Sequence, residues 1–191
     1  MGLFKLKKIK GEKGLIYNNK KIIVLIDEKQ LKDRVKELGR KITKDYEDRS
    51  PVLVSVLRGS FIFVADICRE IKIPVTFDFM AVSSYGDSKV SSGIVRITKD
   101  LESSIENKEV IIIEDIIDSG RTLNYLIKNL QARNPKNVEV CALLDKDVPR
   151  KTKNNIKYKG FDIPNKFVVG YGLDFAEKYR NFPFVGYIEN E

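Results

Sequence analysis

Short apolar runs alternate along this chain with segments in which apolar residues recur every three or four positions. Residues 52–57 form an apolar run that is long enough for a buried strand and too short for a helix. A helical spacing follows over 61–71, and residues 75–82 are expected to form another strand. Parallel strands need a crossover connection, which is usually a helix. The alternation therefore predicts an α/β fold with a mainly parallel sheet flanked by helices.

The remaining segments extend this pattern within one domain of 191 residues. Asp27 is expected to cap a helix over residues 28–48, and the spacing of leucines predicts another helix near 123–130. Further strands are expected at 22–26, 94–98, 110–114 and 138–144, with short ones at 167–170 and 184–188. We expect residues 1–21 to form a poorly packed basic extension, and residues from about 145 to 191 to fold over the sheet edge as a small C-terminal hood.

The segment from residue 110 to 123 carries the strongest functional signal. An apolar strand ends in two acids, Glu114 and Asp115, and a polar turn with a glycine leads into a helix. Ligands of open α/β sheets bind at the carboxyl ends of strands, and a helix N-terminus offers backbone N–H groups to phosphate. We expect residues 118–122 to hold a phosphate, while the two carboxylates accept hydrogen bonds from neighbouring hydroxyl groups of a sugar. The structural alternative is an ordinary strand, turn and helix with capping acids.

The composition narrows the chemistry. The chain has 35 Lys and Arg against 27 Asp and Glu, and its net charge of +8 suits an anionic partner without identifying it. It contains no histidine, so a general base must be a carboxylate, a lysine or a tyrosine. No apolar run approaches the ~20 residues of a membrane helix. Cys68 and Cys141 are expected to be buried free thiols of a reducing compartment, which predicts a cytoplasmic location.

Four blocks of this sequence resemble the type I phosphoribosyltransferases, and among them the short, bacterial-like hypoxanthine or hypoxanthine-guanine enzymes. The blocks are residues 55–61, 84–86, 110–123 and 166–174, and the resemblance runs from about residue 22 to 188. It implies the type I phosphoribosyltransferase fold and the reaction of that family in purine salvage. In this reaction a 5-phosphoribosyl group passes from phosphoribosyl diphosphate (PRPP) to a 6-oxopurine, with Mg²⁺ as cofactor. The products are IMP or GMP and pyrophosphate.

The resemblance also implies which residues bind PRPP. Glu114 and Asp115 match the acids that hold the ribose hydroxyls. The loop for the 5′-phosphate corresponds to Asp118, Ser119, Gly120, Arg121 and Thr122. The loop for pyrophosphate, in which a non-proline cis peptide bond is typical, corresponds to Leu57, Arg58 and Gly59. Arg180 matches an arginine that holds pyrophosphate. Many relatives have lysine at position 58, so Arg58 departs from the usual pattern.

The purine site follows in the same way, with the hood contributing most of it. Asp118 matches the residue that relays the N7 proton of the purine and is the expected catalytic residue. Lys146 matches the lysine that donates to the 6-oxygen. Phe167 matches the aromatic residue that stacks on the base, and Val168 contributes backbone contacts to its edge. Asp174 is expected beside the purine and matches a ligand of the second Mg²⁺.

The metal and the lid complete these expectations. The expected Mg²⁺ ligands are the carboxylates of Glu114, Asp115 and Asp174. Ser84 and Tyr85 match a lid that closes in catalysis, within the polar stretch 83–93. Such a lid would keep the reactive ribosyl group from water.

Two alternatives stay open. A lysine ammonium donates and cannot accept, so Lys146 argues against the 6-amino group of adenine, whereas xanthine is excluded only weakly. A regulator that binds RNA or DNA, with PRPP as effector, would also suit the positive charge. The presence of Asp118, Lys146 and Phe167 together favours the enzyme. The expected partners are therefore PRPP, a 6-oxopurine and further copies of the chain in a homodimer or homotetramer, with neither a membrane nor a nucleic acid.

Overall fold

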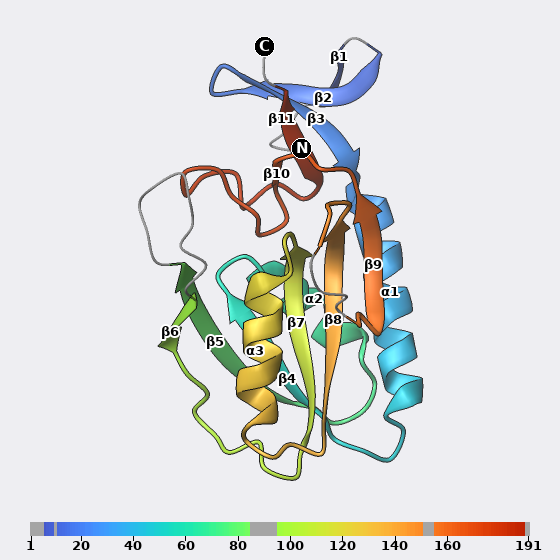
Figure 1. Ribbon diagram of the computed structural model, residues 1–191. Helices are drawn as coiled ribbons and strands as arrows, with labels where there is room; N and C mark the ends of the chain where they lie inside the picture. Colours follow the sequence, from blue (N-terminus) through green and yellow to red (C-terminus); the bar gives the residue numbers. More distant parts are fainter. Residues whose placement is uncertain (1–5, 10, 85–94, 151–154, 190–191) are drawn as a thin grey trace.

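The computed structural model describes residues 6–9, 11–84, 95–150 and 155–189 (Figure 1). Its centre is a six-stranded sheet with the strand order β6-β5-β4-β7-β8-β9. These strands are β4 Val52–Leu57, β5 Thr76–Ser84, β6 Val95–Lys99, β7 Glu109–Ile117, β8 Asn137–Lys146 and β9 Tyr158–Ile163. All neighbouring strands run parallel except β5 and β6, which pair antiparallel. The predicted α/β sheet is confirmed.

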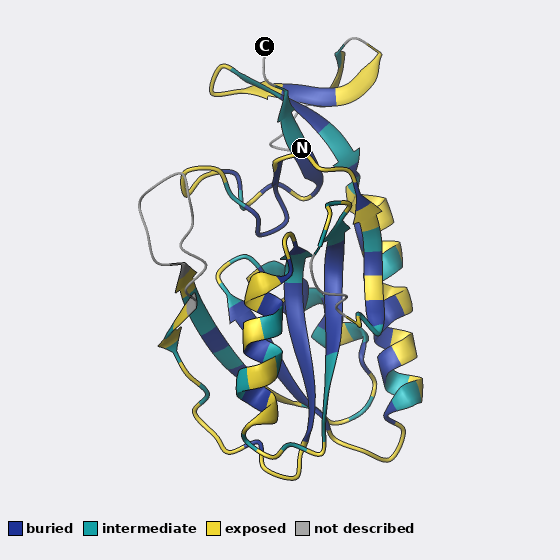
Figure 2. Ribbon diagram, in the orientation of Figure 1, coloured by how far each residue is buried: buried dark blue, intermediate teal, exposed yellow. Residues whose placement is uncertain are grey.

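Helices cover both faces of this sheet, which explains why its central strands direct apolar side chains toward both faces. The helices are α1 Glu28–Asp45, α2 Phe61–Glu70 and α3 Arg121–Gln131. Successive side chains of a strand point to opposite faces. On β7, Ile111 packs in one core with α1 and α2, whereas Ile112 packs in a second core with α3. Figure 2 shows the result, with buried central strands and exposed outer surfaces on the helices.

The helix α1 begins where its sequence predicts. The side chain of Asp27 accepts a hydrogen bond from the Gln30 backbone N–H at 3.0 Å, and the Gln30 side chain accepts one from the Asp27 N–H at 2.9 Å. This reciprocal capping box stabilises the first turn. The helix ends at Asp45, three residues before the expected end at 48, and Asp48 has a φ of 60° that turns the chain away from the helical direction.

A second sheet lies beyond the carboxyl ends of the central strands (Figure 1). It is antiparallel, with the order β1-β2-β3-β11-β10. Its strands are β1 Lys7–Ile9, β2 Glu12–Tyr17, β3 Lys20–Ile26, β10 Val168–Val169 and β11 Val185–Glu189. Leu15 and Ile22 from the N-terminal part are buried with Phe182 and Phe184 from the C-terminal part. The hood is therefore built from both ends of the chain.

Two expectations about the ends of the chain need correction. The N-terminal segment is not poorly packed over its described residues, because β2 pairs with β3 and buries Leu15. The segment from residue 145 onward does not belong wholly to the hood, because β9 extends the central sheet parallel to β8. Gly160 on β9 lies so close to β8 that an added Cβ would sit 2.3 Å from the Leu143 carbonyl oxygen. β9 mixes polar and apolar residues, so its sequence does not predict that it pairs with β8.

The remaining expectations concern the two cysteines and membrane-spanning helices. Both cysteines are free, but only Cys141 is buried; Cys68 is partly exposed, which corrects the expectation for that residue. Within the described residues, no helix is both long and apolar enough to cross a membrane.

Candidate active site

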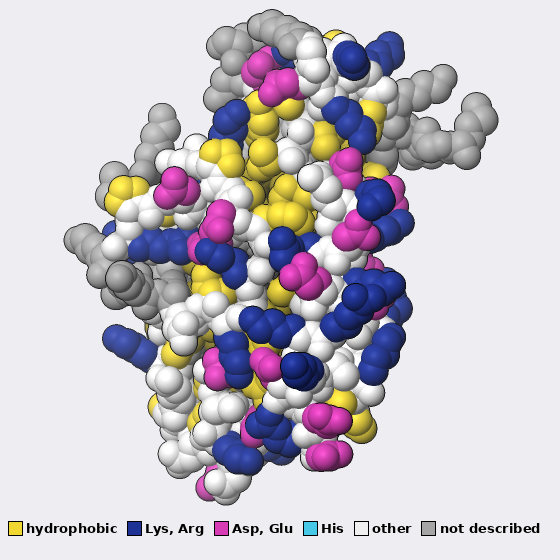
Figure 3. Space-filling view, turned by 90° about the vertical axis from the view of Figure 1, so that its right-hand side faces the viewer, with side chains coloured by type: hydrophobic (Ala, Val, Ile, Leu, Met, Phe, Trp, Pro, Cys, Tyr) yellow, Lys and Arg dark blue, Asp and Glu magenta, His cyan; other side chains and the backbone are white. Residues whose placement is uncertain are grey.

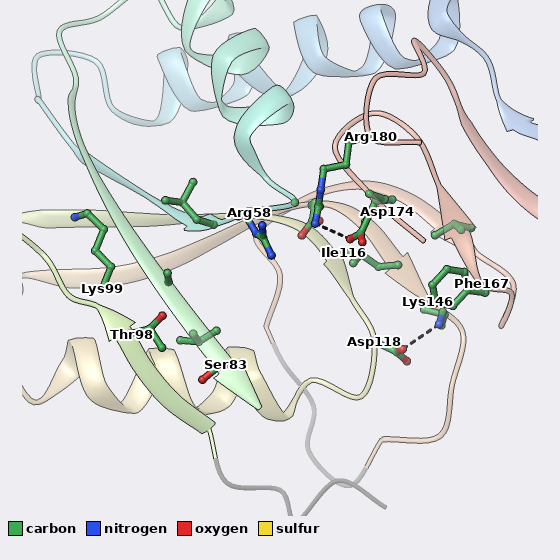
Figure 4. A pocket seen from close by; sticks show the side chains of 17 residues that line it. Arg58, Ser83, Thr98, Lys99, Ile116, Asp118, Lys146, Phe167, Asp174 and Arg180 are labelled. Carbon is green, nitrogen blue, oxygen red and sulfur yellow. Dashed lines mark hydrogen bonds and ion pairs between the residues drawn. The ribbon is translucent and has the colours of Figure 1, made fainter. Parts of the chain in front are cut away.

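A cavity of about 720 Å³ lies between the carboxyl ends of the central strands and the hood (Figure 4). A smaller cavity of about 220 Å³ adjoins it at the N-terminus of α3. Both are lined by Leu57, Gly59, Asp115 and Asp118, so they form one continuous site. This is the edge of an open α/β sheet where ligands bind.

The floor of the site is acidic. Glu114 and Asp115 lie inside β7, which continues to Ile117 instead of ending at residue 114 as expected. Burial, together with the neighbouring charge of Asp115, raises the pKa of Glu114 well above its ordinary value. Burial also raises the pKa of Asp115 to about 6, although backbone hydrogen bonds and Arg180 oppose the shift. Both carboxylates would be stabilised by hydroxyl donors or by a cation.

The loop 57–59 packs tightly against this floor. The peptide bond between Leu57 and Arg58 is cis, as the resemblance predicts. A Cβ on Gly59 would lie 1.7 Å from Oδ2 of Asp115, and a Cβ on Gly172 of the hood would lie 2.0 Å from the Gly59 carbonyl oxygen. Glycine is required at position 172, where φ is 101° and the nearest atom is backbone, whereas a side chain at position 59 would displace the Asp115 carboxylate.

Acidic side chains of the hood hold the two expected pyrophosphate arginines. Arg58 pairs with Glu177 at 2.8 Å. Arg180 pairs with Asp174 at 2.8 Å and with Glu177 at 3.5 Å, and it donates to the Gly172 carbonyl oxygen at 2.7 Å. The arginines thus lie at the same wall of the cavity, each with a carboxylate partner.

The expected phosphate loop lies at the start of α3. Gly120 directly precedes the helix with a φ of 75°, a conformation that favours glycine. Ser119, Gly120 and Thr122 line the smaller cavity. Arg121 is the first residue of α3, and its exposed side chain is not among the residues that line the two cavities.

A cation and a carboxylate meet at the far side of the main cavity. Lys146 at the end of β8 donates to Oδ2 of Asp118 at 2.9 Å. The lysine side chain is 10% exposed and that of Asp118 is 61% exposed. Phe167 lies beside Lys146 (Figure 4) and is 58% exposed, so it does not belong to the core. Its ring is held edge-on by Phe175, with ring centroids 5.6 Å apart. This surface suits a flat ligand ring that stacks on Phe167, with an acceptor atom for Lys146 next to a donor atom for Asp118.

Most of the expected residues line one of the two cavities, and some residues that line them were not expected from the sequence. Val168, Asp174 and Arg180 line the main cavity as expected. Ser84 ends β5, and Tyr85 lies outside the described residues. Thr98 and Lys99 of β6 also line the cavity, although no sequence motif marks them.

In the described part of the chain, no group of three or more Cys, Asp or Glu side chains forms a ready metal site.

Replacing Glu114 with glutamine is expected to raise the melting temperature (Tm) of the substrate-free protein. The folded protein favours the protonated carboxyl, because its pKa lies above the ordinary 4.5. The fold therefore loses stability as pH rises through that raised pKa, whereas glutamine stays neutral. We expect the Tm difference to widen from about pH 5 to about pH 8, by about 2–4 °C for each kcal/mol regained.

Thermal unfolding in the presence of a metal chelator measures this difference. Glu47→Gln, which changes an exposed carboxylate, is the matched control and should leave Tm nearly unchanged at every pH. A Tm difference for the Glu114 variant that is independent of pH would contradict the prediction.

The comparisons with known proteins agree with this geometry. Residues 25–176 match the family model described as the phosphoribosyl transferase domain. A hypoxanthine phosphoribosyltransferase of Buchnera aphidicola subsp. Schizaphis graminum is 51% identical over 167 residues, which cover 86% of this chain and 94% of that protein. A hypoxanthine-guanine phosphoribosyltransferase of Dictyostelium discoideum is 50% identical over 172 residues, which cover 88% and 96%. A crystal structure of a Staphylococcus aureus hypoxanthine phosphoribosyltransferase is 46% identical, with a TM-score of 0.83 and coverage of 87% and 90%.

Proposed function

The chain belongs to the phosphoribosyl transferase family, and from this we propose that it is a purine-salvage enzyme that acts on hypoxanthine and guanine. It transfers the 5-phosphoribosyl group of PRPP to the base and releases pyrophosphate. The observation that carries this proposal is the pair of Lys146 and Asp118, 2.9 Å apart beside the exposed ring of Phe167. The pair lies in the same cavity as the acidic floor and adjoins the start of α3.

PRPP occupies the part of the site between β4 and α3. Its 5′-phosphate takes the smaller cavity, where Ser119 and Thr122 supply hydroxyls and the helix N-terminus supplies positive potential. Its ribose hydroxyls donate to Glu114 and Asp115. The pyrophosphate lies along the loop 57–59, where backbone groups, Arg58 and Arg180 neutralise it as it leaves.

The purine stacks on Phe167 with its six-membered ring edge toward Val168. Lys146 donates to the 6-oxygen and Asp118 accepts the N7 proton as the bond to the sugar forms at N9. The 6-oxygen and N7 of the purine are neighbours. The short distance between the Lys146 and Asp118 side chains therefore lets one group bind each of these atoms. A 6-amino group would face the lysine with a second donor, which selects against adenine.

The donor set also fits Mg²⁺. The cation prefers carboxylate and phosphate oxygens and usually takes only one or two protein carboxylates. Asp115 and Asp174 line the same cavity, and the raised pKa values of Glu114 and Asp115 mark carboxylates that a cation would stabilise. We propose that Asp174 would hold one Mg²⁺ and that Glu114 and Asp115 would hold another, each together with PRPP oxygens. Bound there, Mg²⁺ would offset the negative charge of the leaving pyrophosphate.

An absorbance assay with PRPP and Mg²⁺ tests the proposal. Hypoxanthine, guanine, xanthine and adenine are offered in parallel. Turnover of hypoxanthine and guanine without adenine is the expected result, and the rate with xanthine settles the selectivity at the 2-position. Binding of PRPP without turnover of any base would contradict the proposal and favour the regulator.

Replacing Glu177 with glutamine is expected to tighten PRPP binding. Glu177 pairs with both arginines at the pyrophosphate end of the site, so incoming PRPP must compete with its carboxylate. Glu177 is 62% exposed in both pairs, and pairs with such exposed groups are worth at most about 1 kcal/mol, so we expect a gain of about two- to five-fold in affinity. Calorimetric titration with PRPP and Mg²⁺ measures it.

The control for this variant is Glu28→Gln, which breaks an exposed ion pair with Lys32 on α1, away from the site. It should leave PRPP affinity unchanged. Weaker binding by the Glu177 variant would mean that its carboxylate supports the arginines and does not compete with the substrate.

We further propose that the chain assembles as a homodimer or homotetramer in the cytoplasm and does not act on nucleic acid. The free thiols suit a reducing compartment. Figure 3 shows basic side chains interspersed with acidic ones over the face that carries α1, and pairs such as Lys29–Asp33 lie there. Nucleic-acid binding favours a continuous basic stripe. Light scattering coupled to size-exclusion chromatography measures the mass of the assembly.

A further inference from the structure

Arg150 makes an unusual set of contacts at the ends of β7 and β8. Its Nε donates to the Asp118 carbonyl oxygen at 2.7 Å. Its Nη2 donates to the carbonyl oxygens of Ile117 and Lys146, each at 2.7 Å. Its Nη1 lies 2.5 Å from Oδ1 of Asp145, and the arginine side chain is only 15% exposed. All three nitrogens of the guanidinium group therefore contact the two strand ends.

These contacts begin where the sheet ends. The last paired residues of β7 and β8 are Ile117 and Asp145, and the two strands lie side by side up to that point (Figure 1). Asp118 and Lys146 are the next residues of each chain segment, beyond the last β7–β8 pair, and Lys146 still pairs with Ile163 of β9. The β7–β8 pairing ends at Ile117 and Asp145, so it does not by itself fix the separation of Asp118 and Lys146. Arg150 bridges the Asp118 and Lys146 carbonyls.

We propose that Arg150 is a positioning residue that holds Asp118 and Lys146 at the spacing of the purine N7 and 6-oxygen. The inference rests on the proposed function, since it concerns the purine half of that site. Arg150 itself does not line the main cavity, and it acts through the backbone of the two residues that do.

The ion pair between Asp118 and Lys146 is insufficient to set this spacing. Asp118 is 61% exposed, and exposed ion pairs contribute little. The purine must also insert its own atoms between the two groups, so their positions must persist after the pair opens. The contacts of Arg150 are made to main-chain carbonyls and to the largely buried Asp145, so opening the Asp118–Lys146 pair does not break them.

Replacing Arg150 with lysine keeps the charge but loses the planar fork that reaches several acceptors at once. We expect kcat/KM for hypoxanthine to fall about 10- to 100-fold, since misplacing reacting groups by about 1 Å costs up to that factor. The dissociation constant for PRPP, measured by calorimetry, should stay nearly unchanged, because the expected PRPP contacts lie elsewhere. Asp145→Asn, which removes the charged partner of Arg150 and retains its carbonyl contacts, should give a smaller loss in the same direction.

Lys159→Met is the matched control, because Lys159 lies 3.5 Å from the same Asp145 carboxylate but does not contact the strand-end carbonyls. It should retain the wild-type kcat/KM. If the wild-type enzyme turns over hypoxanthine and the Arg150→Lys variant is equally active, the inference about Arg150 is wrong and the proposed function stands. An equal loss of PRPP affinity and purine kcat/KM also overturns it, because the role would then be general stability. A wild-type protein that binds PRPP without turning over hypoxanthine overturns the proposed function and the inference together.

Discussion

Replacing Asp118 with asparagine is expected to lower kcat for IMP synthesis by about 10²–10⁴-fold, the usual contribution of a general base. The KM for PRPP should change far less. Asparagine has almost the same shape and its oxygen can still accept a hydrogen bond from Lys146, which now meets Asp118 at 2.9 Å. It cannot take up the N7 proton. The chain has no histidine that could replace the carboxylate.

Steady-state rates at saturating hypoxanthine, with PRPP varied, measure both quantities. Asp147→Asn is the matched control, because it neutralises an exposed carboxylate one residue from Lys146 that does not line the main cavity. It should retain the wild-type kcat. An Asp118→Asn enzyme with undiminished kcat would show that the proton leaves by another route.

Replacing Lys146 with methionine is expected to lower kcat/KM for hypoxanthine by about 10- to 100-fold. This range corresponds to the loss of one hydrogen bond from a charged donor, about 1.5–3 kcal/mol. Methionine keeps the apolar part of a side chain that is only 10% exposed, so the wall of the cavity is largely retained. PRPP affinity should be nearly unchanged, because the lysine lies at the purine end of the site.

The same substitution should also reduce discrimination against adenine. The wild-type ammonium opposes a 6-amino group with a second donor, and methionine removes that conflict. The measurement is the ratio of kcat/KM for hypoxanthine to that for adenine, which should fall. Lys159→Met on β9 serves as the control for loss of one positive charge nearby. An unaltered ratio would mean that another group selects the 6-oxo base.

The part of the site that lies on β7 and at the start of α3 could be predicted from the sequence. The apolar run, the two acids, the polar turn and the helical leucine spacing are consecutive residues, so their arrangement follows from local geometry. The capping of α1 by Asp27 is equally local. The family resemblance added Lys146, Phe167 and Arg180, and all three line the cavity. Their roles in catalysis and binding stay predictions until variants are measured.

The parts that could not be predicted depend on contacts between distant segments. β3 has no local signal for its neighbours, yet it pairs with β2 on one side and with β11, more than 150 residues later, on the other. β9 becomes a strand because the edge of β8 is available to it and Gly160 permits close approach. The positions of Arg150 and Glu177 follow from the same kind of contact, since each meets partners from separate elements.

The order of residues along the chain was thus sufficient for the α/β class, the turn before α3 and the acidic floor, because each follows from a pattern of consecutive residues within a short segment. The N-terminal half of the hood, the position of β9 in the central sheet and the contacts of Arg150 with the Asp118 and Lys146 carbonyls were decided only by the tertiary structure. Each of these features depends on backbone or charged groups that bind partners in distant segments of the chain. The local residue pattern does not indicate which segments those are.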